Sequence, residues 1–186
     1  MPTHRISVGN TLTPIGMILR QNGRGVDLTG ATVKFAMFTA TGAVKVAETA
    51  SNVTLQPTST FTADAATDKL TSALHRLQLD DEVFVSNSGG ALPGGLAAAT
   101  RYWVVGINGD TFQLATSKRG SAIDVTSAGT GTHSFEIIGS MQYDFQAADV
   151  NSPGTFHAYA TLYSGAEWDT FPVVSQQLSV DIFPVN

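Results

Sequence analysis

The stretch Tyr143-Asp-Phe-Gln-Ala-Ala-Asp-Val-Asn-Ser-Pro-Gly-Thr-Phe-His-Ala-Tyr-Ala-Thr-Leu-Tyr163 predicts a strand, a polar corner and a second strand. In its second half, apolar residues occupy every second position: Phe156, Ala158, Ala160 and Leu162. Turn-forming residues precede them: Asp149, Asn151, Pro153 and Gly154. This alternation is typical of an antiparallel strand with one buried face. The strand therefore belongs to a sheet whose apolar face must be covered by another part of the chain.

The same alternation recurs on both sides of this stretch. Near the C-terminus it involves Leu178, Val180 and Ile182, and far upstream it involves Val33, Phe35 and Met37, followed by Val44 and Val46. Helix signals are almost absent, since only residues 63–77 and 95–100 could form a short turn of helix. The sequence therefore predicts an all-β fold, with the upstream strands covering the downstream ones.

Composition excludes several classes of protein. The chain has 186 residues, of which 42% are hydrophobic, which is enough for an ordinary core. Its net charge is −5 with no run of Lys or Arg, so we expect no nucleic-acid partner. It has no cysteine, and hence neither a disulfide framework nor a thiolate metal site. We also expect no signal peptide, no membrane span and no cofactor.

A change of composition near Pro57 divides the chain. Residues 59–67 are rich in Thr, Ala and Asp, which is typical of a linker or an exposed crossing. A second β-rich region follows, with predicted strands at 70–77, 82–86, 102–107, 111–115, 123–126 and 132–137. We therefore predict a discontinuous domain, residues 1–60 and 138–186, that is interrupted by an inserted β-rich module at residues 61–137.

The outer segments resemble a known family. The similarity is carried by Asp27-Leu-Thr-Gly-Ala-Thr-Val-Lys-Phe35, Gly42-Ala-Val-Lys-Val46, Tyr143-Asp-Phe-Gln-Ala-Ala-Asp149, Ser152-Pro-Gly-Thr-Phe156 and Thr170-Phe-Pro172. These resemble the immunoglobulin-like β-sandwich of tailed-phage virion proteins, in the family of the baseplate upper protein N-terminal domain. In that family the pattern is continuous, whereas here it is split between Leu55 and Ile138.

The interrupting segment has a resemblance of its own. It is carried by Leu74-His-Arg-Leu-Gln-Leu-Asp-Asp-Glu-Val83, Leu92-Pro-Gly-Gly-Leu96, Thr100-Arg-Tyr-Trp-Val-Val105, Asp110-Thr-Phe-Gln-Leu114, Ala122-Ile-Asp-Val-Thr126 and Gly129-Thr-Gly-Thr-His133. These look like a small β-rich, barrel-like module of phage tail and fibre proteins, in which glycine is commoner at the position of Asp80. Together the two resemblances imply an immunoglobulin-like sandwich with an inserted module, in a virion structural protein of the tail or baseplate without catalytic residues.

Chemistry-bearing residues form no recognisable catalytic or metal-binding motif. The four histidines, His4, His75, His133 and His157, lack the spacing of a metal site. Asp80-Asp-Glu82 lacks the alternating oxygen ligands and glycine of a calcium loop, so we interpret it as a solvated turn. Glu167 and Asp169 alternate on one strand face, but nothing else supports a carboxylate pair for sugar hydrolysis. We therefore predict a protein that is not an enzyme.

The outward face of the Thr155–Tyr163 strand is the candidate assembly interface. It consists of His157, Tyr159, Thr161 and Tyr163. A solvated strand face normally carries Lys, Glu or Thr, so this aromatic row predicts burial against another subunit, or against another part of the same chain such as the inserted module.

Two functions remain open from the sequence. The first is a virion component that assembles in several copies with itself and with other tail or baseplate proteins, and that is made in the cytoplasm of the bacterial host. The second is a module for a host glycan or receptor, with Tyr102, Trp103 or Trp168 as stacking platforms. A third function, decoration of the capsid, would use the same kind of assembly as the first and differ from it in location.

Overall fold

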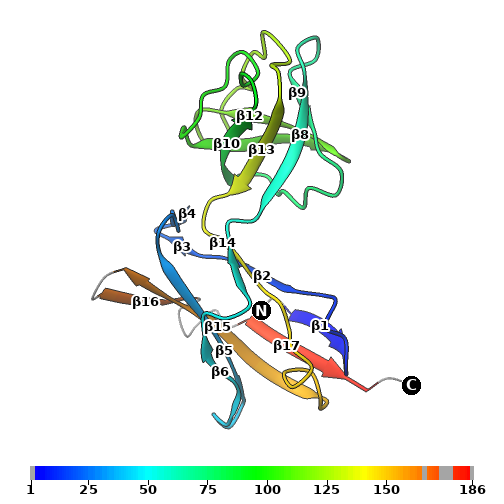
Figure 1. Ribbon diagram of the computed structural model, residues 1–186, viewed down its shortest axis with the longest axis vertical. Coiled ribbons are helices and arrows are strands. Elements are labelled where there is room, and N and C mark those ends of the chain that lie inside the picture. Colours follow the sequence, from blue (N-terminus) through cyan, green and yellow to red (C-terminus); the bar gives the residue numbers. More distant parts are fainter. Residues whose placement is uncertain (1–2, 165–166, 172–177, 185–186) are drawn as a thin grey trace. The chain divides into compact units, whose positions relative to one another are not determined.

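The structure is a computed structural model that describes residues 3–164, 167–171 and 178–184, with backbone only for 164 and 167–171. The chain divides into two compact units. The first comprises Met1–Gln21, Val26–Leu55 and Gly139–Asn186, and the second comprises Asn22–Gly25 and Gln56–Ile138. Strands but no helices occur in the described residues (Figure 1), so the prediction of an all-β, sandwich-like fold is confirmed.

The first unit contains two sheets. The larger one has six strands in the order β1-β17-β15-β5-β6, with β16 also paired to β15. Its strands are β1 (Thr3–Ser7), β5 (Thr32–Thr39), β6 (Val44–Thr49), β15 (Gly154–Ser164), β16 (Glu167–Phe171) and β17 (Leu178–Phe183). The smaller sheet has the order β2-β14-β7, with β2 (Ile15–Ile18), β7 (Val53–Leu55) and β14 (Ser140–Tyr143). The short strand β3 (Arg20–Gln21) lies at the end of the first segment.

Strand β15 organises the larger sheet because it pairs antiparallel with β5, β16 and β17. Ala158 and Ala160 on its inward side are small and fully buried. Their neighbours in register on β5 are Met37 and Phe35, so the expectation that this upstream strand covers the apolar face is wrong: it lies beside β15 in the same sheet. The ring of Tyr143, from the smaller sheet, packs against this layer instead. Small residues beside large ones allow the layers to interdigitate at high density.

Aromatic rings from both sheets join in the core. The ring of Phe35 stacks on that of Tyr143 from the smaller sheet, with centroids 4.1 Å apart. Phe145 meets both rings edge to face. The buried Tyr143 hydroxyl donates a hydrogen bond to Asp149 at 2.8 Å, and burial is the main cause that raises its pKa. This contact satisfies the polar end of an otherwise apolar core.

The second unit is a closed barrel, in the order β10-β11-β12-β9-β8-β13. Its strands are β8 (Thr58–Asp64), β9 (Lys69–Thr71), β10 (Glu82–Ser88), β11 (Tyr102–Asn108), β12 (Thr111–Ala115) and β13 (Thr132–Ile137), and the unit also contains β4 (Arg24–Gly25). Alternate side chains fill the interior, among them Phe61, Val83, Val104, Phe112 and Phe135. Closure leaves the barrel without the two free edges of an open sheet.

The expected linker at residues 59–67 is wrong in the structure, because most of it is strand β8. Phe61 is buried while Thr60 and Thr62 beside it are exposed. Threonine is a good strand former, and a barrel strand needs few apolar residues when its partners supply the rest of the core. Low apolar content was therefore a poor sign of a linker here.

Two predicted strands are also corrected. The strand expected at 70–77 ends at Thr71, because Leu74 and Arg76 have positive φ angles of 52° and 54°, which no strand allows. Residues 123–126 form no ladder, since their backbone N–H groups donate to scattered acceptors such as Leu114 and Asp68. Both segments are loops that contribute side chains to the barrel.

The Phe35–Tyr143 stack gives the first prediction. Truncation of Phe35 to Ala leaves a cavity between the sheets and is expected to lower the free energy of unfolding by about 3–5 kcal/mol. Val44→Ala is the control, because Val44 is 61% exposed, and its effect should stay within about 0.5 kcal/mol. Urea denaturation followed by circular dichroism measures both, and equal losses would contradict this account of the core.

Candidate functional site

The predicted assembly face is the outward side of the larger sheet in the first unit, opposite the side that packs into the core. His157, Tyr159, Thr161 and Tyr163 alternate along β15 with the buried residues of the core. The register places Phe38 opposite His157 and Ala36 opposite Tyr159. Because residues in register lie on the same side of a sheet, the row is continued sideways by Phe38 and, on β6, by the exposed Val44.

Tyr159 is held by an aromatic neighbour. Its ring stacks on Phe38 with centroids 5.0 Å apart and planes inclined by 18°. Both residues are half-buried, and burial raises the pKa of Tyr159. The two stacked rings form one continuous aromatic surface on this face of the sheet.

Tyr163 has polar partners instead. Its hydroxyl lies 3.1 and 3.0 Å from the two carboxylate oxygens of Glu48 and donates to that group. The Lys34 ammonium lies 4.4 Å from the ring centroid, within the range of a cation–π interaction. The hydrogen bond to Glu48 raises the pKa of Tyr163, with desolvation and the nearby negative charge adding to it.

The other two members of the row are more enclosed. Thr161 is buried, and the Nδ1 atom of His157 is buried without a hydrogen-bond partner in the part of the chain that the structure describes. A buried ring nitrogen without a partner costs free energy, so this position is costly in the isolated chain. The four residues therefore share one face, as predicted, but their side chains differ in exposure and in their hydrogen-bond partners.

The three residues of the glycan hypothesis are not equivalent. Tyr102 is buried in the barrel core and its hydroxyl accepts a hydrogen bond from the Ala97 N–H at 2.8 Å, so its ring presents no face to a sugar. Trp103 is half-buried on the barrel's outer side, with the Arg24 guanidinium 5.5 Å from its ring centroid. The side chain of Trp168 lies outside the described part of the structure. Of the two side chains that the structure describes, Trp103 has an outward position and Tyr102 does not.

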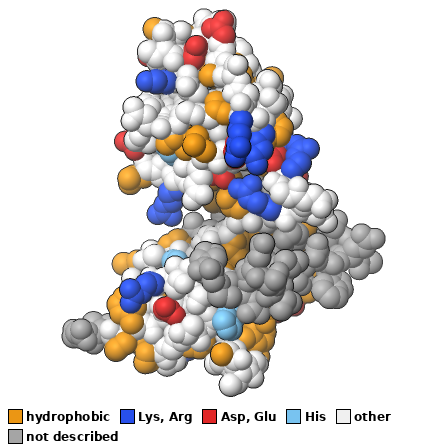
Figure 2. All heavy atoms as spheres, turned by 180° about the vertical axis from the view of Figure 1, so that it is seen from behind, with side chains coloured by type: hydrophobic (Ala, Val, Ile, Leu, Met, Phe, Trp, Pro, Cys, Tyr) orange, Lys and Arg blue, Asp and Glu red, His pale blue; other side chains and the backbone are white. Residues whose placement is uncertain are grey.

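Several basic side chains of the second unit lie close together. On the face seen in Figure 2, a group of Lys and Arg side chains lies at one side of this unit. Those with described ion pairs are Arg24 and Arg101, which contact Glu82, and Lys118 and Arg119, which contact Asp80. No charge run in the sequence predicted this cluster.

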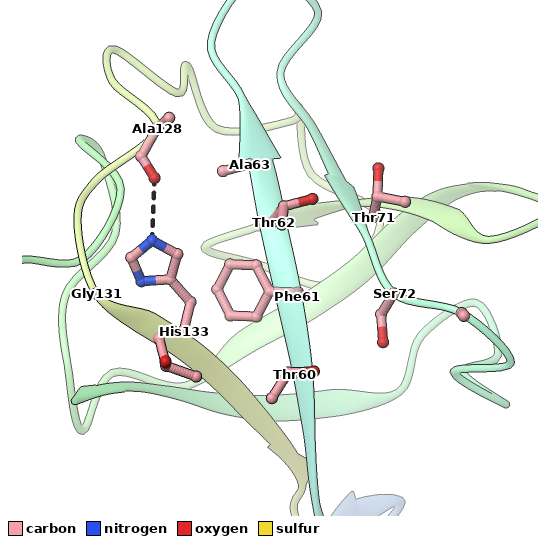
Figure 3. Close-up of a pocket in the computed structure, with 11 residues that line it drawn as sticks. Thr60, Phe61, Thr62, Ala63, Thr71, Ser72, Ala128, Gly131 and His133 are labelled. Atoms are coloured by element: carbon pink, nitrogen blue, oxygen red, sulfur yellow. Dashed lines mark hydrogen bonds between the residues drawn. The ribbon is translucent and has the colours of Figure 1, made fainter. Parts of the chain in front are cut away.

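A groove of about 490 Å³ lies on the second unit (Figure 3). Its lining is rich in hydroxyl groups, from Thr60, Thr62, Thr71 and Ser72, and the described residues that line it include no charged side chain. His133 lies at one wall, where its Nε2 is 3.0 Å from the Ala128 carbonyl oxygen and its ring is 5.4 Å from that of Phe61. These contacts are those of a packed core histidine.

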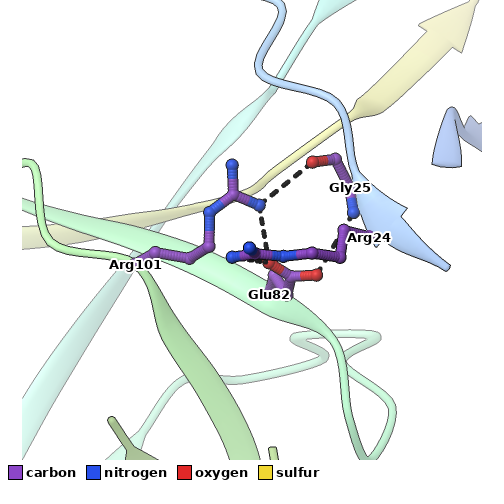
Figure 4. A network of polar contacts seen from close by, with 4 residues as sticks. All are labelled: Arg24, Gly25, Glu82 and Arg101. Carbon is purple, nitrogen blue, oxygen red and sulfur yellow. Dashed lines mark hydrogen bonds and ion pairs between the residues drawn. The ribbon is translucent and has the colours of Figure 1, made fainter. Parts of the chain in front are cut away.

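A buried carboxylate organises a polar network in the second unit (Figure 4). The side chain of Glu82 is 2% exposed, and Arg101 donates to it at 2.5 Å. The Gly25 N–H donates to its other oxygen at 3.3 Å, while Arg101 also donates to the Gly25 carbonyl at 3.0 Å. Arg24 lies 3.5 Å away. The expectation of a solvated turn at Asp80-Asp-Glu82 is therefore wrong for Glu82, whose burial is offset by these partners. It is also wrong for Asp81, which is 2% exposed and accepts a hydrogen bond from the Gln78 N–H.

The geometry of the described residues provides no metal site. The described residues contain no group of three or more His, Cys, Asp or Glu side chains that could hold a metal ion. The side chains of Glu167 and Asp169 lie outside the described part of the chain. In that described part there is also no helix long and apolar enough to cross a bilayer.

Comparisons with known proteins return nothing. The chain matches no family model, and no curated protein and no solved structure resembles it significantly.

Titration of Tyr163 tests the outward face. Glu48→Gln removes the carboxylate that accepts its hydrogen bond, so the pKa of Tyr163 should fall toward that of free tyrosine. Tyr159 is the internal control, because burial alone raises its pKa. Ring resonances followed by NMR against pH measure both, and an unmoved Tyr163 would show that the Glu48 contact is absent in solution.

Substitution of Glu82 tests the buried network. Glu82→Gln leaves Arg101 without its charged partner and should lower the free energy of unfolding by about 2–3 kcal/mol. Asp80→Asn is the matched control, since Asp80 also contacts two cations but is 21% exposed, and its loss should stay below about 1 kcal/mol. Thermal and urea unfolding measure the loss of stability in both variants. A loss for Asp80→Asn that equals or exceeds the loss for Glu82→Gln would contradict the structural role of the Glu82 network.

Proposed function

We propose that this protein is a non-enzymatic structural component of a bacteriophage virion, in the tail or baseplate, that assembles in several copies. The observation that carries the proposal is the outward face of the larger sheet, where Phe38, Tyr159 and Val44 form an apolar strip on the first unit. Such a strip on a solvent-facing sheet is typical of a surface that is covered in an assembly.

Three further features support the proposal. The sequence motifs at 27–35, 143–149 and 152–156 resemble those of baseplate upper proteins. The chain is built from a sandwich and a closed barrel, which are rigid units suited to a structural role. Among the described residues no catalytic or metal-binding constellation competes with this interpretation.

In this proposal the partners are other copies of the chain and neighbouring virion proteins, and the protein functions within the phage particle. Neither nucleic acid nor membrane is a partner. Contacts of the apolar strip would be repeated around a symmetric ring, so that many weak contacts together give a stable assembly. Capsid decoration would use the same face in a different location.

A second candidate function, binding of a carbohydrate or receptor on the host, is favoured by one observation. Trp103 lies on the outer side of the barrel, half-buried and beside Arg24, whereas Tyr102 is enclosed in the core. A partly exposed indole among polar groups is a common element of ligand sites.

Light scattering on the purified chain tests the assembly face. The double variant Val44→Glu with Tyr159→Glu places two charges on the strip and should convert an oligomer of the wild-type chain to monomer. Tyr163 is left unchanged because a new carboxylate beside Glu48 would disturb the fold for another reason. Thr60→Glu with Thr62→Glu is the matched control: it adds two acids to the exposed side of a strand in the second unit.

The expected result is an oligomer for the wild type and the control, and a monomer for the strip variant, with circular dichroism showing that all three chains are folded. A wild-type chain that stays monomeric up to high concentration, or an oligomer that both double variants dissociate equally, would contradict assembly through this face.

A further inference from the structure

The outer side of strands β10, β11 and β12 places Trp103 between two groups of cations. In register, Trp103 pairs with Glu82 on β10 and with Ala115 on β12. The loop after Ala115 carries Lys118 and Arg119, and Arg24 and Arg101 surround Glu82. The indole therefore has one basic group on each flank, and we call these five residues, Arg24, Arg101, Trp103, Lys118 and Arg119, the basic patch.

The basic patch has a surplus of positive charge. Arg24 and Arg101 share the carboxylate of Glu82, and Lys118 and Arg119 share that of Asp80, at 3.6 and 3.2 Å. Asp81 lies between these two carboxylates in the sequence, so three acidic groups stand against four cations and the patch keeps one net positive charge. The cations remain available to a ligand, since Arg24 is 60% and Arg119 is 81% exposed.

This concentration contrasts with the rest of the molecule. The net charge of the chain is −5, and the other cations of the second unit are Lys69 and Arg76 alone. Four of the unit's six basic side chains thus belong to the basic patch, and Figure 2 shows a group of Lys and Arg side chains at one side of the unit. A local positive field on an acidic protein attracts anions to that place in particular.

Two of the arginines are also ordered by aromatic rings. Arg24 lies 5.5 Å from the Trp103 ring centroid, and Arg101 lies 5.7 Å from that of Phe84. A guanidinium that already lies against a ring and a carboxylate loses less conformational entropy when an anion binds to its free N–H groups. The site is therefore partly pre-organised.

We propose that the basic patch binds an acidic polysaccharide, with one sugar ring against Trp103 and acidic groups on neighbouring sugars at the two flanking cation groups. Arg24 lies over the Trp103 ring, so the C–H face of a pyranose would pack on the exposed part of the indole that Arg24 leaves uncovered. Isolated positive charges on either side of a ring match a polymer whose anions are separated by sugar rings. The proposal does not depend on assembly through the sandwich face, so either can fail alone.

The alternatives fit the same surface less well. A nucleic-acid duplex carries one charge per about 1.7 Å of its axis, and one net positive charge on an acidic chain offers little counterion release. An acidic peptide would use the cations but gives no role to the indole between them. Binding to a DNA duplex and to poly-glutamate distinguishes these two ligands from an acidic polysaccharide.

Binding is measured by biolayer interferometry at low salt with five immobilised probes: polygalacturonate, heparin, neutral dextran, poly-glutamate and a DNA duplex. The expected result is binding to polygalacturonate and heparin that weakens with salt, at least about tenfold weaker binding to poly-glutamate and DNA, and none to dextran. Trp103→Ala and Arg119→Glu should each reduce binding to the two acidic polysaccharides by about tenfold.

Arg76→Glu is the matched control, because Arg76 and Arg119 are both exposed arginines with positive φ, 54° and 57°, and the two reversals change the net charge equally. Arg76→Glu should leave binding unchanged, and circular dichroism melting curves confirm that each variant folds. The proposal is overturned by an absence of binding to both acidic polysaccharides, by binding that Arg76→Glu reduces as much as Arg119→Glu does, or by poly-glutamate or DNA binding equally well without a contribution from Trp103.

Discussion

The stack of Phe35 on Tyr143 is the contact on which the sandwich depends. It joins a central strand of the larger sheet to the middle strand of the smaller one, with ring centroids 4.1 Å apart. The close approach is possible because β15, next to β5, contributes the small side chains Ala158 and Ala160 to the same layer. A larger residue at either alanine would force the sheets apart and remove dispersion contacts from the rest of the core.

The same sheets explain how the first unit accommodates an interruption of more than eighty residues. Strands β7 and β14, where the chain leaves and re-enters, pair with each other, with Met141 opposite Leu55. The second unit repeats this arrangement, since β8 and β13 pair with Glu136 opposite Thr58. When both ends of an insertion lie side by side in the host and in the insert, each core closes without the other. Each unit accordingly has its own hydrophobic cluster.

Periodicity predicted much of this fold but not its polar contacts. The alternation in β5 and β15 is strict because each has one buried face, so the sequence pattern alone indicated both strands. It failed for β8, where threonine supplies strand propensity without hydrophobicity. The expected junctions at 60/61 and 137/138 differ from the observed ones at 55/56 and 138/139, and residues 22–25 belong to the second unit. No local pattern in the sequence predicts that residues 22–25 belong to the second unit. Their contact with that unit includes the hydrogen bond from the Gly25 N–H to Glu82, which is 57 residues away in the sequence.

In the candidate sites too, the sequence pattern predicts which residues share a face but not which residues they contact. That His157, Tyr159, Thr161 and Tyr163 share a face follows from the period of a strand, but their partners Phe38, Lys34 and Glu48 come from other strands and depend on register. These partners also limit what the face can do. Glu48 already accepts the Tyr163 hydroxyl proton, and Phe38 already covers one side of Tyr159. What the strip has left to offer is apolar area rather than hydrogen bonds, and area is non-directional. Such a surface is suited to a broad contact with a complementary protein face, whereas the charged, pre-ordered groups around Trp103 are suited to a ligand that must be recognised by its anions.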